Sequence, residues 1–111
     1  MKAKPVKLVY GQGYFQCPAE EATHVQLNMP GPIPLRYIPV ITSGTRDGTG
    51  CWTWNGCTEK PTLRPSILTE GVGSDEKMHC CHTWVNDGEA QFLSDCSHEL
   101  AGQVVPLLDV V

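Results

Sequence analysis

At 111 residues the chain is long enough for one compact domain and too short for two ordinary ones. Its net charge of −4 and the scattered positions of its eight Lys and Arg residues exclude the basic surface that general nucleic-acid binding requires. Eleven glycines and nine prolines interrupt helices and create turns. The composition therefore predicts a single domain over residues 1–111 that is mainly β, with a small α+β fold as the alternative.

The expected compartment decides how the six cysteines are interpreted. The first ten residues carry lysines but no apolar segment, so no signal peptide is expected. No stretch reaches the roughly 18 apolar residues needed to cross a bilayer, so we expect no membrane association. We therefore expect a cytoplasmic protein. In a reducing cytoplasm the cysteines indicate metal ligands or free thiols, some of them simply buried as small apolar side chains.

The first half of the chain predicts four short strands. Residues 6–10 and 14–17 are apolar runs separated by Gly-Gln-Gly, which is typical of a strand–turn–strand unit. Residues 24–28 alternate between apolar and polar side chains like a half-buried strand, and residues 36–42 form the next strand. Residues 43–50 are rich in glycine and threonine and predict a flexible loop.

The second half continues this pattern. Residues 51–55 alternate strictly and place both tryptophans on one strand face, and residues 66–69 form another short apolar run. Residues 71–77 are polar and predict a second flexible loop. The clearest local prediction is a hairpin between residues 79–85 and 89–93, because Asp-Gly in the turn suits the left-handed backbone that a tight turn demands.

The C-terminal part predicts the one helix of the chain. Asp95 is a suitable N-cap for a short helix over residues 96–101, and Gly102 stands in the position that favours a left-handed C-terminal residue. Residues 104–108 then predict a last apolar strand. The expected architecture is a set of compact antiparallel strands with one short C-terminal helix near residues 95–102.

Two groups of residues have the chemistry of metal ligands. Cys17 and His24 form a C-x6-H pair, and residues 79–82 read His-Cys-Cys-His. A tetrahedral zinc site needs about four nitrogen or sulfur ligands. Alternation along a strand places Cys80 and His82 on one face and His79 and Cys81 on the other, so a regular strand cannot offer Cys81 and His82 to one ion. Further ligand candidates are Cys51, Cys57, Cys96 and His98.

Five sequence blocks carry a family resemblance. They are residues 14–18 (Y-F-Q-C-P) with His24, 52–56 (W-T-W-N-G), 61–67 (P-T-L-R-P-S-I), 81–88 (C-H-T-W-V-N-D-G) and 92–102 (F-L-S-D-C-S-H-E-L-A-G). In these blocks the chain resembles a family of small phage and prophage proteins of unknown function, which are sometimes mislabelled ammonia monooxygenase.

The resemblance implies zinc binding through Cys17, His24 and Cys81. The family motif usually reads C-P-x-C, and this chain has Glu20 in place of the second cysteine. The fourth ligand position is then left to Glu20, to a neighbouring thiol such as Cys80, or to water. A carboxylate is a harder zinc ligand than a thiolate.

A second grouping consists of Ser66, His82, Asp95 and His98. Serine, histidine and aspartate together indicate a possible catalytic triad. Structural roles explain the same residues: Ser66 in a turn after proline, Asp95 as a helix cap, and His98 as a partly buried imidazole. The G-x-S-x-G motif that marks the nucleophile in many hydrolases is absent. The structural roles are therefore favoured at this point.

These observations favour a small, non-enzymatic, metal-binding accessory protein that binds a macromolecule of a bacterial host or a phage, with a protein of the host cell as the expected partner. Its small size and its lack of a complete catalytic motif are the reasons. Two alternatives are a small zinc-dependent hydrolase and a module that binds a nucleotide or another small ligand.

Overall fold

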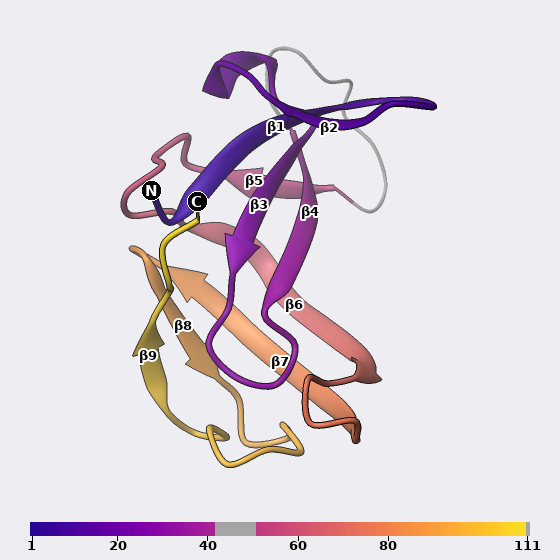
Figure 1. Cartoon of the computed structure of the whole chain (residues 1–111). Coiled ribbons are helices and arrows are strands. Elements are labelled where there is room, and N and C mark those ends of the chain that lie inside the picture. Colours follow the sequence, from indigo (N-terminus) through magenta and orange to yellow (C-terminus); the bar gives the residue numbers. More distant parts are fainter. Residues whose placement is uncertain (42–50, 111) are drawn as a thin grey trace.

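The computed structural model describes residues 1–41 and 51–110, which form one nine-stranded sheet (Figure 1). The strands are β1 (Ala3–Val9), β2 (Gly13–Gln16), β3 (His24–Asn28), β4 (Leu35–Ile41), β5 (Trp52–Trp54), β6 (Leu63–Val72), β7 (Met78–Asn86), β8 (Glu89–Phe92) and β9 (Val104–Pro106). In the described ranges the helical content is a single 3-10 turn, η1 (Ala19–Glu21). The prediction of a mainly β fold is confirmed.

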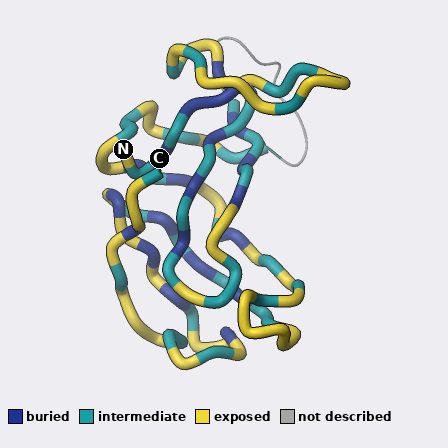
Figure 2. Tube along the Cα trace, viewed as in Figure 1, coloured by how far each residue is buried: buried dark blue, intermediate teal, exposed yellow. Residues whose placement is uncertain are grey.

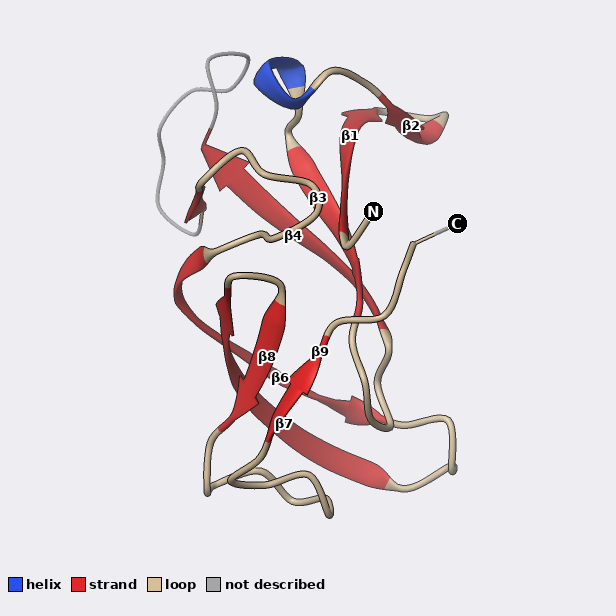
Figure 3. Cartoon of the chain, turned by 90° about the vertical axis from the view of Figure 1, so that its left-hand side faces the viewer, coloured by secondary structure: helices blue, strands red, loops and turns tan. Residues whose placement is uncertain are grey.

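The strand order in the sheet is β2-β1-β3-β4-β5-β6-β7-β8-β9, and every pairing is antiparallel except the parallel pair β4–β5. The sheet folds over on itself, so that β1, β3 and β4 lie apart from β6 to β9 in Figure 3. The C-terminal segment after β9 contacts β3 and the N-terminal residue. Asn28 and Leu108 form an isolated bridge, and the backbone N–H of Val110 donates to the carbonyl of Met1 at 2.8 Å.

The core lies between the two halves of the folded sheet (Figure 2). Each half presents alternate apolar side chains to the other, as the two-residue period of a strand requires. The largest fully buried side chains include Leu27 and Val40 from one half and Leu63, Val85 and Phe92 from the other. The opposite face of β6, β7 and β8 is therefore left toward solvent, and the candidate site lies on this outer face.

Most of the predicted strands and turns are present. Gly13 has φ +110° in the first hairpin, and Asp87 and Gly88 have φ +48° and +83° in the predicted tight turn. The predicted strand at 66–69 is longer than expected, because Gly71 and Val72 still pair with His79 and Met78. The loop predicted at 71–77 is correspondingly shorter. The loop predicted at 43–50 lies outside the described residues.

The predicted helix near residues 95–102 is wrong. This segment forms consecutive turns, with the N–H of Cys96 bonded to the carbonyl of Leu93 and that of Ala101 bonded to His98. The reason is competition for backbone groups, because the N–H of Ser97 donates to Cys80 in β7 at 2.9 Å. Gly102 does adopt the expected left-handed backbone, with φ +80°. Among the described residues no helix has the length and apolar character needed to cross a membrane.

Candidate active site

Ser66 lies at an irregularity of strand β6. The pairing of β6 with β7 shifts register between Leu63 and Ile67, and Ser66 falls inside this interruption. Such a bulge bends a strand and redirects a side chain, and bulges are common next to active sites. Ile67 returns to the core with 3% of its surface exposed, whereas Ser66 is only half-buried. The irregularity thus leaves Ser66 only partly buried.

His82 comes from the middle of the neighbouring strand β7. Cys81 is buried with 1% exposure, so alternation directs His82 to the outer face, as predicted from the sequence. Its Nε2 atom lies 2.9 Å from Oγ of Ser66. The bulge in β6 and the neighbouring strand β7 therefore bring the serine and the histidine into hydrogen-bond contact.

Asp95 is supplied by the loop that follows β8. Its two carboxylate oxygens lie 2.9 and 3.2 Å from Nδ1 of His82. The loop is tied to the backbone of β7 on both sides of Asp95, because Leu93 N–H donates to His82 at 2.9 Å and Ser97 N–H donates to Cys80 at 2.9 Å. The Ser97 hydroxyl also accepts the N–H of Cys80 at 2.8 Å. These bonds place Asp95 beside the histidine.

The contacts favour one tautomer of His82. A carboxylate accepts hydrogen bonds, so Nδ1 carries the proton that faces Asp95. Nε2 is then free to accept the hydroxyl proton of Ser66, the arrangement in which a histidine activates a serine. The His82 side chain is 25% exposed and that of Asp95 is 61% exposed. The group is therefore open to a substrate from the solvent side.

A second serine, histidine and aspartate lie close together elsewhere but with different geometry. His79 contacts Asp75 through Nε2 at 2.9 Å, whereas Ser97 lies 3.4 Å from its Nδ1. The hydrogen bond from His79 is the main cause that lowers the pKa of Asp75. Ser97 is already engaged with the backbone of β7, and its contact with His79 is long. This group lacks an activated hydroxyl.

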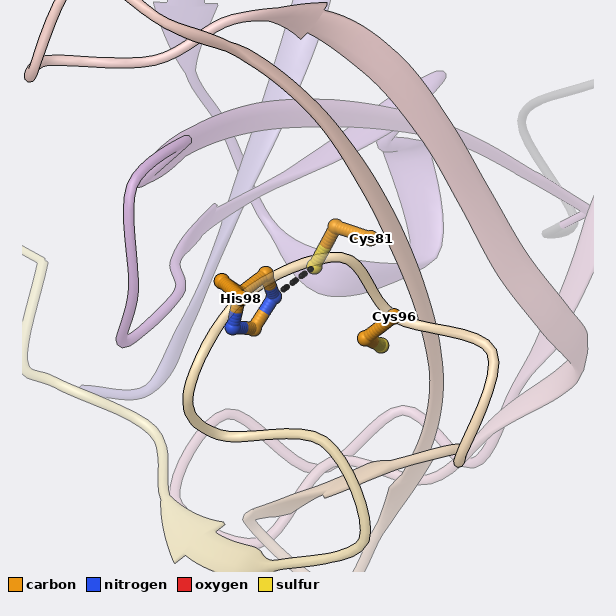
Figure 4. A group of neighbouring side chains, drawn as sticks. All are labelled: Cys81, Cys96 and His98. Carbon is orange, nitrogen blue, oxygen red and sulfur yellow. Dashed lines mark hydrogen bonds between the residues drawn. The ribbon is translucent and has the colours of Figure 1, made fainter.

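Behind His82, on the core side of β7, three other side chains gather: Cys81, Cys96 and His98 (Figure 4). Their ligand atoms all lie within 4.8 Å of one another. The two cysteines are 1% and 9% exposed, and Nε2 of His98 lies 3.4 Å from the Cys81 sulfur. Burial is the main cause that lowers the pKa of His98, which favours the neutral imidazole that binds metals. This cluster could bind a metal ion.

The remaining predicted ligands lie in the other half of the sheet. Cys17 follows β2 and is half-buried, and burial is the main cause that raises its pKa. His24 begins β3, with Nδ1 2.9 Å from the Thr23 hydroxyl, and burial lowers its pKa. Glu20 lies in η1. In the described part of the chain these residues do not belong to the metal-type cluster, and their role as ligands stays a prediction.

Of the predicted ligands, Cys81 is the member of the cluster, and its neighbour Cys80 is directed away from it by strand alternation. Cys96 and His98, predicted only as further ligand candidates, complete the cluster. Their signal in the sequence is the Cys-x-His spacing directly after Asp95. The structure also divides the predicted catalytic grouping: Ser66, His82 and Asp95 come together, whereas His98 contacts Cys81.

A serine, a histidine and an aspartate joined in this order define the catalytic group of serine hydrolases. Residues 4–93, more than half of the chain, match the family described as "Bacterial ubiquitination-like system serine protease (BubE)", and the chain belongs to this family. The matched segment contains Ser66 and His82 and ends shortly before Asp95. No curated protein and no solved structure shows a significant match to the chain.

This match corrects the function predicted from the sequence. The prediction of a non-enzymatic accessory protein is wrong, because the family is described as a serine protease. The missing G-x-S-x-G motif had counted against a triad. That motif belongs to one strand-to-helix turn, whereas here the serine stands at an irregularity of an antiparallel strand pair. The description of the family names a bacterial system, and a phage origin of this chain stays a prediction.

Proposed function

We propose that the chain is a serine peptidase in which Ser66 is the nucleophile, His82 the general base and Asp95 the residue that orients His82. The observation that carries this proposal is the continuous hydrogen-bond connection from Ser66 through both ring nitrogens of His82 to Asp95, at 2.9 Å for each shortest contact. Membership of a family described as a serine protease supports it.

The geometry supports an acyl-transfer mechanism in two halves. His82 Nε2 accepts the hydroxyl proton while Ser66 Oγ bonds to the substrate carbonyl carbon, and the same proton then goes to the leaving amine as the C–N bond breaks. Water, deprotonated by His82, next attacks the carbonyl carbon of the acyl-serine ester; the Oγ–C bond breaks, the carboxylic acid product leaves, and His82 returns the proton to Ser66 Oγ. The Asp95 carboxylate stabilises the imidazolium that forms in each half.

The surface beside the triad has the character of a peptide-binding surface. Leu68 pairs directly with His82 across β6 and β7, and Val72 pairs with Met78 on the same outer face. These three apolar side chains are 57%, 65% and 71% exposed. We propose that they contact apolar side chains of an extended polypeptide, so that the expected protein partner is the substrate.

Replacing Leu68→Ser is expected to raise KM for a peptide substrate on the order of tenfold with little change in kcat, because uniform binding contacts are lost. Steady-state kinetics measures this. The matched control is Leu35→Ser, since Leu35 is similarly exposed at 55% but begins β4 in the other half of the sheet. Equal KM values for the two variants would exclude Leu68 from the binding surface.

Zinc is the ion that we propose for the cluster of Cys81, Cys96 and His98. Thiolates and imidazole are the ligands that zinc takes in proteins, and two cysteines with one histidine leave a further position open. An ion at this place would supply a cross-link between β7 and the loop after β8. It would lie on the core side of β7, whereas the reacting atoms lie on the outer face.

A fluorophosphonate probe, which reacts with activated serines, tests the proposed function on the intact protein. We expect peptide mapping by mass spectrometry to find the label on Ser66 and to find none on the Ser66→Ala variant. The Ser97→Ala variant is the control, because Ser97 is the hydroxyl near the other His–Asp pair. Labelling confined to Ser97, or no labelling of the folded protein, would contradict the proposal.

A further inference from the structure

The cluster of Cys81, Cys96 and His98 is built from direct neighbours of the triad. Cys81 precedes His82 on β7, and Cys96 follows Asp95 on the loop after β8. In Figure 4 the ring of His98 points to Cys81, with Cys96 beside them. A metal ion bound by both cysteines would therefore link the two backbone segments that hold the histidine and the aspartate.

The sulfur of Cys96 also touches the backbone of the catalytic histidine. It lies 3.2 Å from both the N and the O atom of His82. One residue away, the Asp95 carboxylate meets the ring of the same histidine at 2.9 Å. A displacement of Cys96 would thus change the separation of the Asp95 carboxylate from Nδ1 of His82.

A buried arginine with an unused hydrogen-bond donor lies beside the cluster. Arg36 is 5% exposed, with Nε bonded to the Ile33 carbonyl at 3.0 Å and Nη1 to Thr69 at 2.6 Å. Its Nη2 is buried without a hydrogen-bond partner, and the ion pairs found among the described residues do not include Arg36. A buried donor without an acceptor is unfavourable.

Cys81 is the member of the cluster that interacts with Arg36. A metal ion deprotonates the cysteines that bind it. Bound thiolates would then face the guanidinium, which can donate a hydrogen bond to sulfur as residues around metal sites commonly do.

We propose that a zinc ion bound by Cys81, Cys96 and His98 fixes the loop 93–98 to β7 and thereby holds Asp95 against His82. The cysteines and His98 are positioning residues, because they act on the reaction through the His82–Asp95 contact. The catalytic part of this inference rests on the proposed function. The metal-binding part does not depend on it.

Metal binding requires two local changes in hydrogen bonding. With Nε2 of His98 on the metal, the proton moves to Nδ1, so the long contact of 3.3 Å from the Leu100 N–H to Nδ1 must open. Cys96 as a thiolate keeps the hydrogen bond from the N–H of His82 and loses the one from its thiol to the His82 carbonyl. Both lost contacts are weak compared with metal–ligand bonds.

The metal site is tested by elemental analysis of the purified protein and by substitution with Co²⁺. We expect one equivalent of zinc, and thiolate-to-cobalt charge-transfer bands that Cys96→Ser and His98→Gln weaken or abolish. Cys57→Ser and Cys17→Ser are the controls and should keep the bands, since both cysteines lie outside the cluster. No binding of Zn²⁺ or Co²⁺, or loss of the bands in Cys17→Ser but not in Cys96→Ser, would overturn the site.

Positioning is tested on the unmodified protein, so that folding of a variant does not decide the result. Removing the zinc with a chelator should broaden or shift the low-field proton resonance of His82 Nδ1–H and lower kcat by up to about 10²-fold, the scale of a small misplacement. Adding Zn²⁺ should restore both, with the β-sheet circular dichroism unchanged throughout. An unaltered resonance in the zinc-free protein would overturn the inference.

The two proposals fail in distinguishable ways. Absence of fluorophosphonate labelling on Ser66 would end the proposed function, whereas the metal content and the His82 resonance would still decide the positioning role of the cluster. Conversely, a labelled Ser66 whose reactivity and His82 resonance do not respond to zinc removal would retain the peptidase and overturn the role of the metal.

Discussion

Replacing Ser66→Ala is expected to reduce peptide hydrolysis by roughly 10³- to 10⁶-fold in kcat, the range seen when a serine nucleophile is removed. The reason is that no other hydroxyl in the described part of the chain contacts His82 Nε2. The fold should survive, because Ser66 lies at an irregularity of β6 and outside the core cluster. Active-site titration and steady-state kinetics on the purified protein measure the loss.

Ser97→Ala is the matched control for this experiment. Ser97 also stands near a histidine that contacts an aspartate, but its hydroxyl accepts the backbone N–H of Cys80 at 2.8 Å. We expect kcat of this variant to fall only a few-fold, because the backbone bonds from Leu93 to His82 and from Ser97 to Cys80 still hold the loop that carries Asp95. A Ser66→Ala protein that keeps its activity, or equal losses in the two variants, would show that the nucleophile is another group.

Asp95→Asn is expected to lower kcat by about 10⁴-fold with a small change in KM, as in triads where the aspartate is replaced by its amide. An amide nitrogen facing Nδ1 favours the wrong imidazole tautomer and removes the charge that stabilises the imidazolium. Circular dichroism should stay unchanged, because the Asp95 side chain is 61% exposed. Kinetics at saturating substrate separates kcat from KM.

The comparison variant for Asp95 is Asp75→Asn. Asp75 makes an equally short contact of 2.9 Å with a histidine, His79, but this pair lines a cavity of about 440 Å³ with His98 and does not reach Ser66. We expect its kcat to remain within a few-fold of the unmodified protein. A larger loss in Asp75→Asn than in Asp95→Asn would transfer the orienting role to the second pair.

Hydrogen-bond geometry, more than residue type, separates these two groups. Both contain one serine, one histidine and one aspartate, and both use residues of β7. In the first group the serine faces Nε2 at 2.9 Å and the aspartate faces Nδ1, whereas in the second the serine lies 3.4 Å from Nδ1. A hydroxyl that already accepts a short backbone bond is a poor candidate for activation.

Local patterns in the sequence predicted those parts of the molecule that depend on near neighbours. The turn at Asp87 and Gly88 follows from the left-handed backbone that these residues tolerate. The opposite orientation of Cys81 and His82 follows from the two-residue period of a strand. This alternation predicts that the His82 side chain lies on the strand face opposite Cys81, where Ser66 and Asp95 are the residues predicted to contact it.

Other features were decided by contacts between distant segments. The interruption of β6 at Ser66 exists only in relation to the register of β7. The segment after Asp95 was predicted as a helix, yet its backbone groups bond to β7 instead, because a strand edge lay within reach. The helix propensity of the segment after Asp95 does not account for hydrogen bonds to β7, because Cys80 and Ser97 are separated in the sequence by most of a hairpin.

By itself, the sequence determined a mainly β chain, its two tight hairpins, and the separation of Cys81 from His82 on opposite strand faces, because turn preferences and strand alternation act within a few residues. Only the tertiary structure decided that Ser66 and Asp95 contact His82 while His98 joins Cys81 and Cys96 instead. Those contacts join strand β6, strand β7 and the loop after β8, and they form only when the sheet is paired in its final register.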